Sequence, residues 1–219
     1  MNDQPLPWPI RGTFAVVALV LIVGALLFVA PSLVAPRWPW PLKPFTMRFL
    51  GAIYLGEMVA VLATLFVQRD PPVRLTVPQA AVFTGIVTLA SFLSLSHFDF
   101  GRPLVWGWFA IYILPGFILS AYAWRIRGWS PPQAQPARGL CRGILLAKSL
   151  VLAVYGLALL LVPLSASSFW PWPIDAFHAR IYSALFLTGA IGAWLLHRQA
   201  TAVEWRTLGA TQLVLSVLV

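Results

Sequence analysis

Glu57 is the residue whose type and position are best suited to chemistry. It lies ten residues into an apolar run, Met47–Val67, and it is the only acid clearly inside such a run. An ionisable side chain near the centre of a membrane helix costs about 3 kcal/mol on insertion scales, so it is a functional candidate by default. The functional interpretation is a relay for a proton or a cation. The structural alternative is a protonated glutamic acid that hydrogen-bonds to a neighbouring helix.

Two arginines, Arg48 and Arg180, each follow the second proline of a Trp-Pro-Trp-Pro segment by seven residues. Both begin an apolar run, where a cation opposes the positive end of the helix dipole, so each should have a specific partner. Carboxylates of Asp99 and Asp175 are one expected set of partners. The other is cation–π contact with the indole rings of the two segments: Trp38, Trp40, Trp170 and Trp172. The functional alternative is an anion or lipid-headgroup site.

A weaker group of polar side chains comprises His97, Asp99, Asp175 and His178, all expected near one membrane face. No pair among them has a recognised metal-ligand spacing, so we expect no metal site and no cofactor. The single cysteine, Cys141, excludes an intrachain disulfide. Because HExxH, GxSxG, Walker and GxGxxG patterns are absent from the sequence, we expect no catalytic residue and no enzyme.

The elements that must position these residues are membrane helices. Hydrophobic residues make up 60% of the chain and charged residues 10%, against roughly a quarter charged in soluble domains. Six apolar runs each approach the roughly 20 residues that cross a bilayer: 13–34, 47–67, 77–95, 104–124, 144–164 and 179–196. A seventh run begins near Thr207 and reaches Val219, which is too short to span. We therefore predict an all-α, polytopic bundle of six complete spans and a truncated seventh within a single transmembrane domain, 1–219.

An internal repeat is predicted by a shift of 132 residues, which aligns Trp38-Pro39-Trp40-Pro41 with Trp170-Pro171-Trp172-Pro173. The same shift pairs Arg48 with Arg180 and Arg74 with Arg206. Shared hydrophobicity does not produce matches of such rare residues, so we interpret the repeat as real. The predicted plan is repeat one at 13–98, a connector helix at 104–124, a cytoplasmic linker at 125–143 and repeat two at 144–219. An even number of crossings separates equivalent helices, which makes the repeats parallel, in a 3+1+3 order.

This plan is similar, in architecture only, to that of the SWEET sugar carriers, which are also built from parallel repeats. The pattern W-P-W-P-L-x-P-F-x-x-R-x-x-G-A, followed later by Ser96-His97-Phe98-Asp99-Phe100, resembles uncharacterised multi-pass bacterial membrane proteins. That resemblance implies a membrane protein and no particular activity.

The distribution of charge predicts orientation and partners. Ten of the 15 lysines and arginines fall on the amino-terminal side of the predicted spans, and five fall on the other: Arg37, Lys43, Arg48, Arg102 and Arg180. The positive-inside rule therefore predicts a cytoplasmic amino terminus, with the WPWP segments on the outer face. The resemblance to bacterial proteins implies that this membrane is the bacterial cytoplasmic membrane. Scattered basic residues argue against nucleic acid, which leaves the lipid bilayer and other membrane subunits as partners. Two functions remain open: translocation of a small solute or ion through Glu57, or a non-catalytic accessory or scaffold subunit of a membrane complex.

Overall fold

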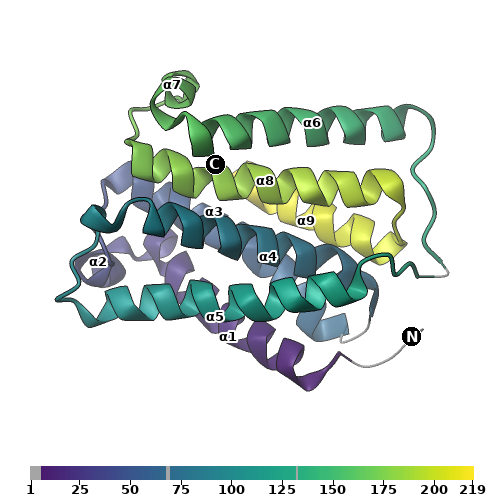
Figure 1. Cartoon of the computed structure of the whole chain (residues 1–219), viewed down its shortest axis with the longest axis horizontal. Helices are drawn as coiled ribbons and strands as arrows, with labels where there is room; N and C mark the ends of the chain where they lie inside the picture. Colours follow the sequence, from purple (N-terminus) through teal and green to yellow (C-terminus); the bar gives the residue numbers. More distant parts are fainter. Residues whose placement is uncertain (1–5, 68–69, 132) are drawn as a thin grey trace. The chain divides into compact units, whose positions relative to one another are not determined.

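The computed structural model of the chain describes residues 6–67, 70–131 and 133–219 (Figure 1). Arg69, one of the ten cations counted on the amino-terminal side, lies outside them. Six of the described helices are long and apolar enough to cross a membrane: α1 (Trp8–Val29), α3 (Pro44–Val67), α4 (Asp70–Phe92), α5 (Pro103–Ile126), α6 (Gly139–Leu161) and α8 (Ala176–Arg198). The prediction of an all-α, polytopic membrane protein is confirmed.

Prolines set several helix ends that hydropathy placed elsewhere. The predicted run 13–34 ends at Val29, and the run 144–164 ends at Leu161, because Pro31 and Pro163 lack the N–H that would continue the helix. Each proline instead begins a short helix that a 3₁₀ turn follows. These are α2 (Pro31–Val34) with η1 (Ala35–Arg37), and α7 (Pro163–Ala166) with η3 (Ser167–Phe169). Pro115, by contrast, lies inside the continuous helix α5.

The last helix, α9 (Ala202–Leu218), begins five residues before the predicted run. Its first turn contains Glu204 and Arg206, whose polarity conceals the helix from a hydropathy window. It has 17 residues and is therefore shorter than the six long helices. A further 3₁₀ turn, η2 (Leu95–His97), follows α4.

Helix bounds recur at the spacing of the predicted repeat. A shift of 132 residues places α2 and η1 on α7 and η3 with the same bounds, and it places α1 and α3 on α6 and α8 to within one residue. The first residue of α4 falls on the first residue of α9. These matches support the repeat, although the duplication itself stays a prediction.

The chain forms two compact units that do not coincide with the predicted repeats. Unit 1 consists of Met1–Thr76, Phe98–Ile111 and Ala202–Val219, and unit 2 consists of Val77–His97 and Tyr112–Thr201. Unit 1 therefore combines the first two long helices of repeat one with α9, the third helix of repeat two. Unit 2 combines α6 and α8 with most of α4, the third helix of repeat one. Each unit contains the third helix of the other repeat.

In unit 1, α3 is the central helix and packs against both α1 and α9. Glycines allow close approach to α1: a Cβ atom on Gly24 would collide with the ring of Tyr54, and one on Gly51 would collide with the backbone of Phe28. On another side of α3, Gly56 approaches Leu215 of α9, to which a Cβ atom would lie at 3.4 Å. Small residues at such positions let membrane helices come together over their backbones.

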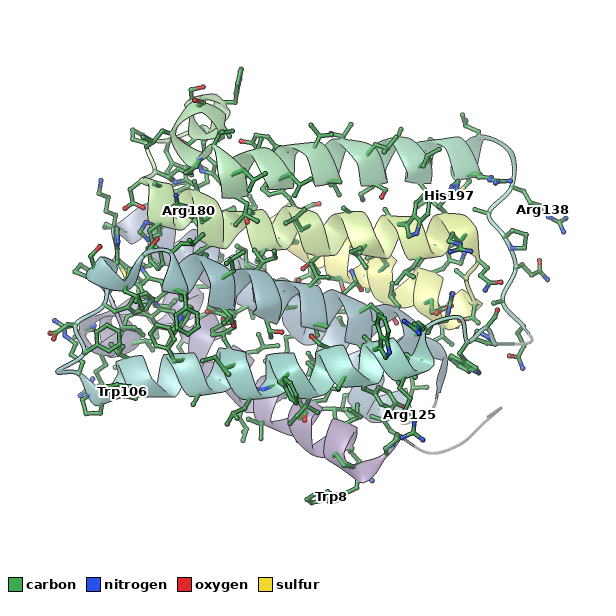
Figure 2. The ribbon with its side chains drawn as sticks, in the orientation of Figure 1. Trp8, Trp106, Arg125, Arg138, Arg180 and His197 are labelled. Atoms are coloured by element: carbon green, nitrogen blue, oxygen red, sulfur yellow. The ribbon has the colours of Figure 1, made fainter. Side chains whose placement is uncertain are left out.

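In unit 2, α6 and α8 run side by side with α7 at the turn between them (Figure 1). Ser149 of α6 donates a hydrogen bond of 2.9 Å to the carbonyl of Ala190 in α8. Gln79 of α4 donates a hydrogen bond of 3.2 Å to the carbonyl of Thr188, which also lies in α8. At the far end of α8, His197 Nδ1 lies 3.1 Å from the carbonyl of Arg142, and Figure 2 shows the ring turned toward α6.

Candidate functional site

Glu57 lies near the middle of α3, thirteen residues after its first residue and ten before its last. Its side chain is half-buried, and no hydrogen bond or ion pair joins it to another residue in the part of the chain that the structure describes. The structural alternative, a glutamic acid hydrogen-bonded to a neighbouring helix, is therefore not what this arrangement presents. A carboxyl group is left with capacity to bind a proton or a cation.

The face of α3 that carries Glu57 is otherwise packed. Residues four before, four after and seven after it, Ile53, Val61 and Thr64, are 4%, 5% and 0% exposed. These spacings place them on the same face of the helix. Phe66 is 81% exposed and lies nine residues on, which at about 100° per residue is the opposite side. The accessible surface of Glu57 therefore lies on the packed side of α3 and not on the side that carries Phe66.

The first WPWP segment belongs to a buried aromatic cluster of unit 1. Trp38 and Trp40 are 7% and 2% exposed. Their ring centroids lie 5.9 and 4.7 Å from that of Trp108 in α5, and Trp40 lies 5.5 Å from Phe98, all edge to face. Such pairs each add about 0.5–1.5 kcal/mol beyond burial. These two rings are packed inside unit 1, because α5 supplies an aromatic partner that covers them.

The second WPWP segment is more open, with Trp170 and Trp172 both half-buried in unit 2. Trp170 stacks on Tyr182 of α8 at 5.2 Å and lies 5.2 Å from Trp172. By contrast, Trp8, at the start of α1, is 82% exposed and points away from its helix (Figure 2). Exposed indoles of that kind are the ones suited to a membrane interface.

The two repeat-related arginines do not acquire the expected partners. Arg48 is exposed and Arg180 half-buried, and neither shows a cation–π contact or an ion pair with the described residues. The carboxylates proposed for them are engaged elsewhere: Asp99 pairs with Arg102 at 3.1 Å, and Asp175 with a histidine. The Nε atom of Arg180 is buried without a hydrogen-bond partner among the described residues.

The structure brings together three members of the predicted histidine and aspartate group within unit 2. Asp175 caps α8: its Oδ1 accepts hydrogen bonds of 2.8 Å from the backbone N and the Nδ1 of His178. Partial burial acts to raise the pKa of Asp175, but these two bonds and the nearby His97 together lower it to about 2. His97 stacks on Phe177 at 4.8 Å. The described residues contain no group of three or more metal-ligating side chains.

A buried ion pair that the sequence did not predict ties α4 to α9 in unit 1. Arg74 donates from Nε and Nη2 to the two oxygens of Glu204, at 2.8 and 3.0 Å, and the two residues are 7% and 0% exposed. Arg74 was counted among the cations of the amino-terminal side and Glu204 was not singled out, because their sequence separation of 130 gives no local signal. The one available hint was scarcity, since the whole chain has six acids.

Comparison with models of known families, with curated proteins and with solved structures finds no match for the chain.

Proposed function

We propose that the protein is a membrane carrier of a small solute or ion and that Glu57 is its intramembrane relay. The observation that carries the proposal is the position of Glu57: mid-helix, on the packed face of α3, partly accessible, and without a cation partner among the described residues. Packing would seal a purely structural acid or pair it, as it does Glu204 with Arg74. An acid that keeps accessible surface within a membrane span is the usual mark of a proton or cation pathway.

Each compact unit contains the third helix of the other predicted repeat, and this arrangement supports a carrier built from two halves. Carriers with parallel repeats work by movement of one half against the other around a central site. In unit 1, α3 holds Glu57 and packs against α9, which belongs to the other predicted repeat. A shift of α9 would therefore change the surroundings of Gly56 and Glu57 directly. We propose the orientation that the positive-inside rule predicts, with the amino terminus in the bacterial cytoplasm and the WPWP segments outside.

Carbodiimide labelling tests whether Glu57 is accessible and protonated. Dicyclohexylcarbodiimide reacts with protonated carboxyl groups that it can reach from the apolar phase. We expect mass spectrometry of the full chain in mild detergent to find modification at Glu57, and none in Glu57→Gln. Glu204, which is fully buried and paired with Arg74, is the internal control and should stay unmodified. Absence of label at Glu57 would contradict the proposal.

A flux measurement tests the function itself. Liposomes containing the protein and an internal pH dye are given a potassium diffusion potential with valinomycin. The wild type should take up protons faster than Glu57→Gln at equal reconstitution and equal thermal stability. Equal uptake by both would overturn the relay, and co-purification of a stoichiometric membrane partner would then favour the accessory-subunit alternative.

A further inference from the structure

Unit 1 contains a groove that the relay does not use. It has a volume of about 300 Å³, at the lower end of the range for ligand pockets, and it lies between α1, the first WPWP segment and α5. The buried rings of Trp38, Tyr54 and Trp108 line it. Leu19 and Leu104, which also line it, are 65% and 51% exposed. The floor of the groove therefore consists of aromatic rings, and its opening is bordered by exposed aliphatic side chains, which suit contact with lipid hydrocarbon.

One cation lines the groove. Arg37, in η1, is exposed and donates from Nη1 to the carbonyl of Leu33 at 3.2 Å, a bond within its own turn of chain. No carboxylate of the described residues pairs with it. An unpaired guanidinium beside an apolar groove complements a molecule with an anionic head and a hydrocarbon tail. Guanidinium groups bind phosphate oxygens through paired, charge-assisted hydrogen bonds.

The second half of the chain carries aromatic side chains at two positions equivalent to residues that line the groove. The shift of 132 residues places Phe169 at the position of Arg37, and Tyr155 at the position of Val23, which also lines the groove. In unit 2, the Tyr155 ring packs edge to face on Phe186 at 4.9 Å. A tryptophan-proline segment next to a pair of helices therefore does not by itself leave a groove. The groove of unit 1 therefore combines a cation and open space at two positions where the second half has aromatic side chains.

From this geometry we infer that the groove binds an anionic glycerophospholipid, with an acyl chain between Leu19 and Trp108 and the phosphate on the guanidinium of Arg37. The inference does not depend on Glu57, which does not line the groove. Basic pockets between membrane helices that select anionic lipids follow the same physical logic.

Native mass spectrometry of the full chain in mild detergent tests the site, with phosphatidylglycerol and phosphatidylcholine of identical acyl chains as probes. We expect the wild type to bind phosphatidylglycerol about tenfold more tightly than phosphatidylcholine, because the choline cation offsets the phosphate charge beside Arg37. Arg37→Gln should remove that preference. Lys43→Gln, which removes an exposed cation outside the groove, should keep it.

A second pair of variants tests the groove separately from the charge. Gly107 lines the groove, and a Cβ atom there meets no atom within 4 Å, so Gly107→Leu fills the space without a backbone clash. We expect it to weaken both lipids at least fivefold. Gly12→Leu, at another helical glycine with open space around it, should leave both affinities unchanged. If Gly107→Leu fails to fold, Val23→Tyr fills the groove with the side chain found in the second half.

Three results would overturn the inference. Equal affinity for the two lipids removes the selection for a net anionic headgroup, because both headgroups contain a phosphate. If Gly107→Leu or Val23→Tyr binds both lipids as tightly as the wild type does, the groove is not the binding site. An equal loss of preference in Lys43→Gln and Arg37→Gln assigns the effect to general surface charge.

Discussion

The buried pair of Arg74 and Glu204 should be worth more to stability than any other polar contact described in unit 1. Two hydrogen bonds of 2.8 and 3.0 Å join side chains that are 7% and 0% exposed, so removal of one partner takes this counter-ion from a charge that water reaches poorly. Loss of one member of a buried pair typically costs about 3–5 kcal/mol. We therefore expect Glu204→Leu and Arg74→Met each to lower the free energy of unfolding by about that amount.

The double variant separates the cost of an unpaired charge from the value of the pair. Attraction between buried charges is largely offset by their desolvation, so replacement of both with apolar groups of similar volume is often close to neutral. Arg74→Met with Glu204→Leu should thus be more stable than either single variant. Equilibrium unfolding by SDS titration from mild detergent, followed by tryptophan fluorescence, gives the four free energies of the cycle.

The matched control is Arg206, which the predicted repeat aligns with Arg74 but which is exposed on α9. Arg206→Met should change stability by less than about 0.5 kcal/mol, as exposed substitutions usually do. The reasoning is refuted if either single variant at the pair costs less than about 1 kcal/mol, or if the double variant costs the sum of the two singles.

Three further predictions concern the packing and the helix cap. Gly24→Ala should cost about 1–3 kcal/mol by overpacking α1 against α3, whereas Gly12→Ala, with open space around it, should be neutral or stabilising in the same thermal melt. Thr188→Val should leave the free energy of unfolding unchanged or raise it, because it removes a buried hydroxyl that has no partner among the described residues. Its control, Thr64→Val, loses a hydrogen bond of 2.8 Å to the hydroxyl of Thr76 and should lower that free energy by about 1 kcal/mol. Asp175 stabilises the fold above its unfolded pKa of about 4, and this contribution is lost as pH falls toward its folded pKa of about 2. Asp175→Asn keeps the cap, so its melting temperature should vary less than that of the wild type between pH 4 and 2.

Much of the fold could be predicted because the bilayer imposes strong local constraints. Each long helix overlaps a run identified from hydropathy, since a chain in lipid must satisfy its backbone hydrogen bonds within the segment. The errors fall where local chemistry differs from hydropathy: at Pro31 and Pro163, which end apolar runs early, and at the polar first turn of α9.

The candidate site was predictable in part. Glu57 could be identified because an acid within an apolar run is costly wherever the helix packs. The accessible surface of Glu57 on the packed face of α3 could not be predicted, because it depends on which helices surround α3. Partners are equally a matter of tertiary structure: Arg48 and Arg180 were expected to have them and Arg74 was not, yet Arg74 has the buried carboxylate.

The sequence by itself determined that the chain is an all-α membrane protein with six long apolar helices and one midspan acid, since these follow from composition and local hydrogen bonding. Only the tertiary structure decided that α9 packs on α3, that Arg74 and Glu204 meet across 130 residues, and that Trp38 and Trp40 are covered by α5. Hydropathy does not distinguish one apolar helix from another as a packing partner. The choice among helices depends on close packing and on charge pairs whose two members come from distant segments of the chain.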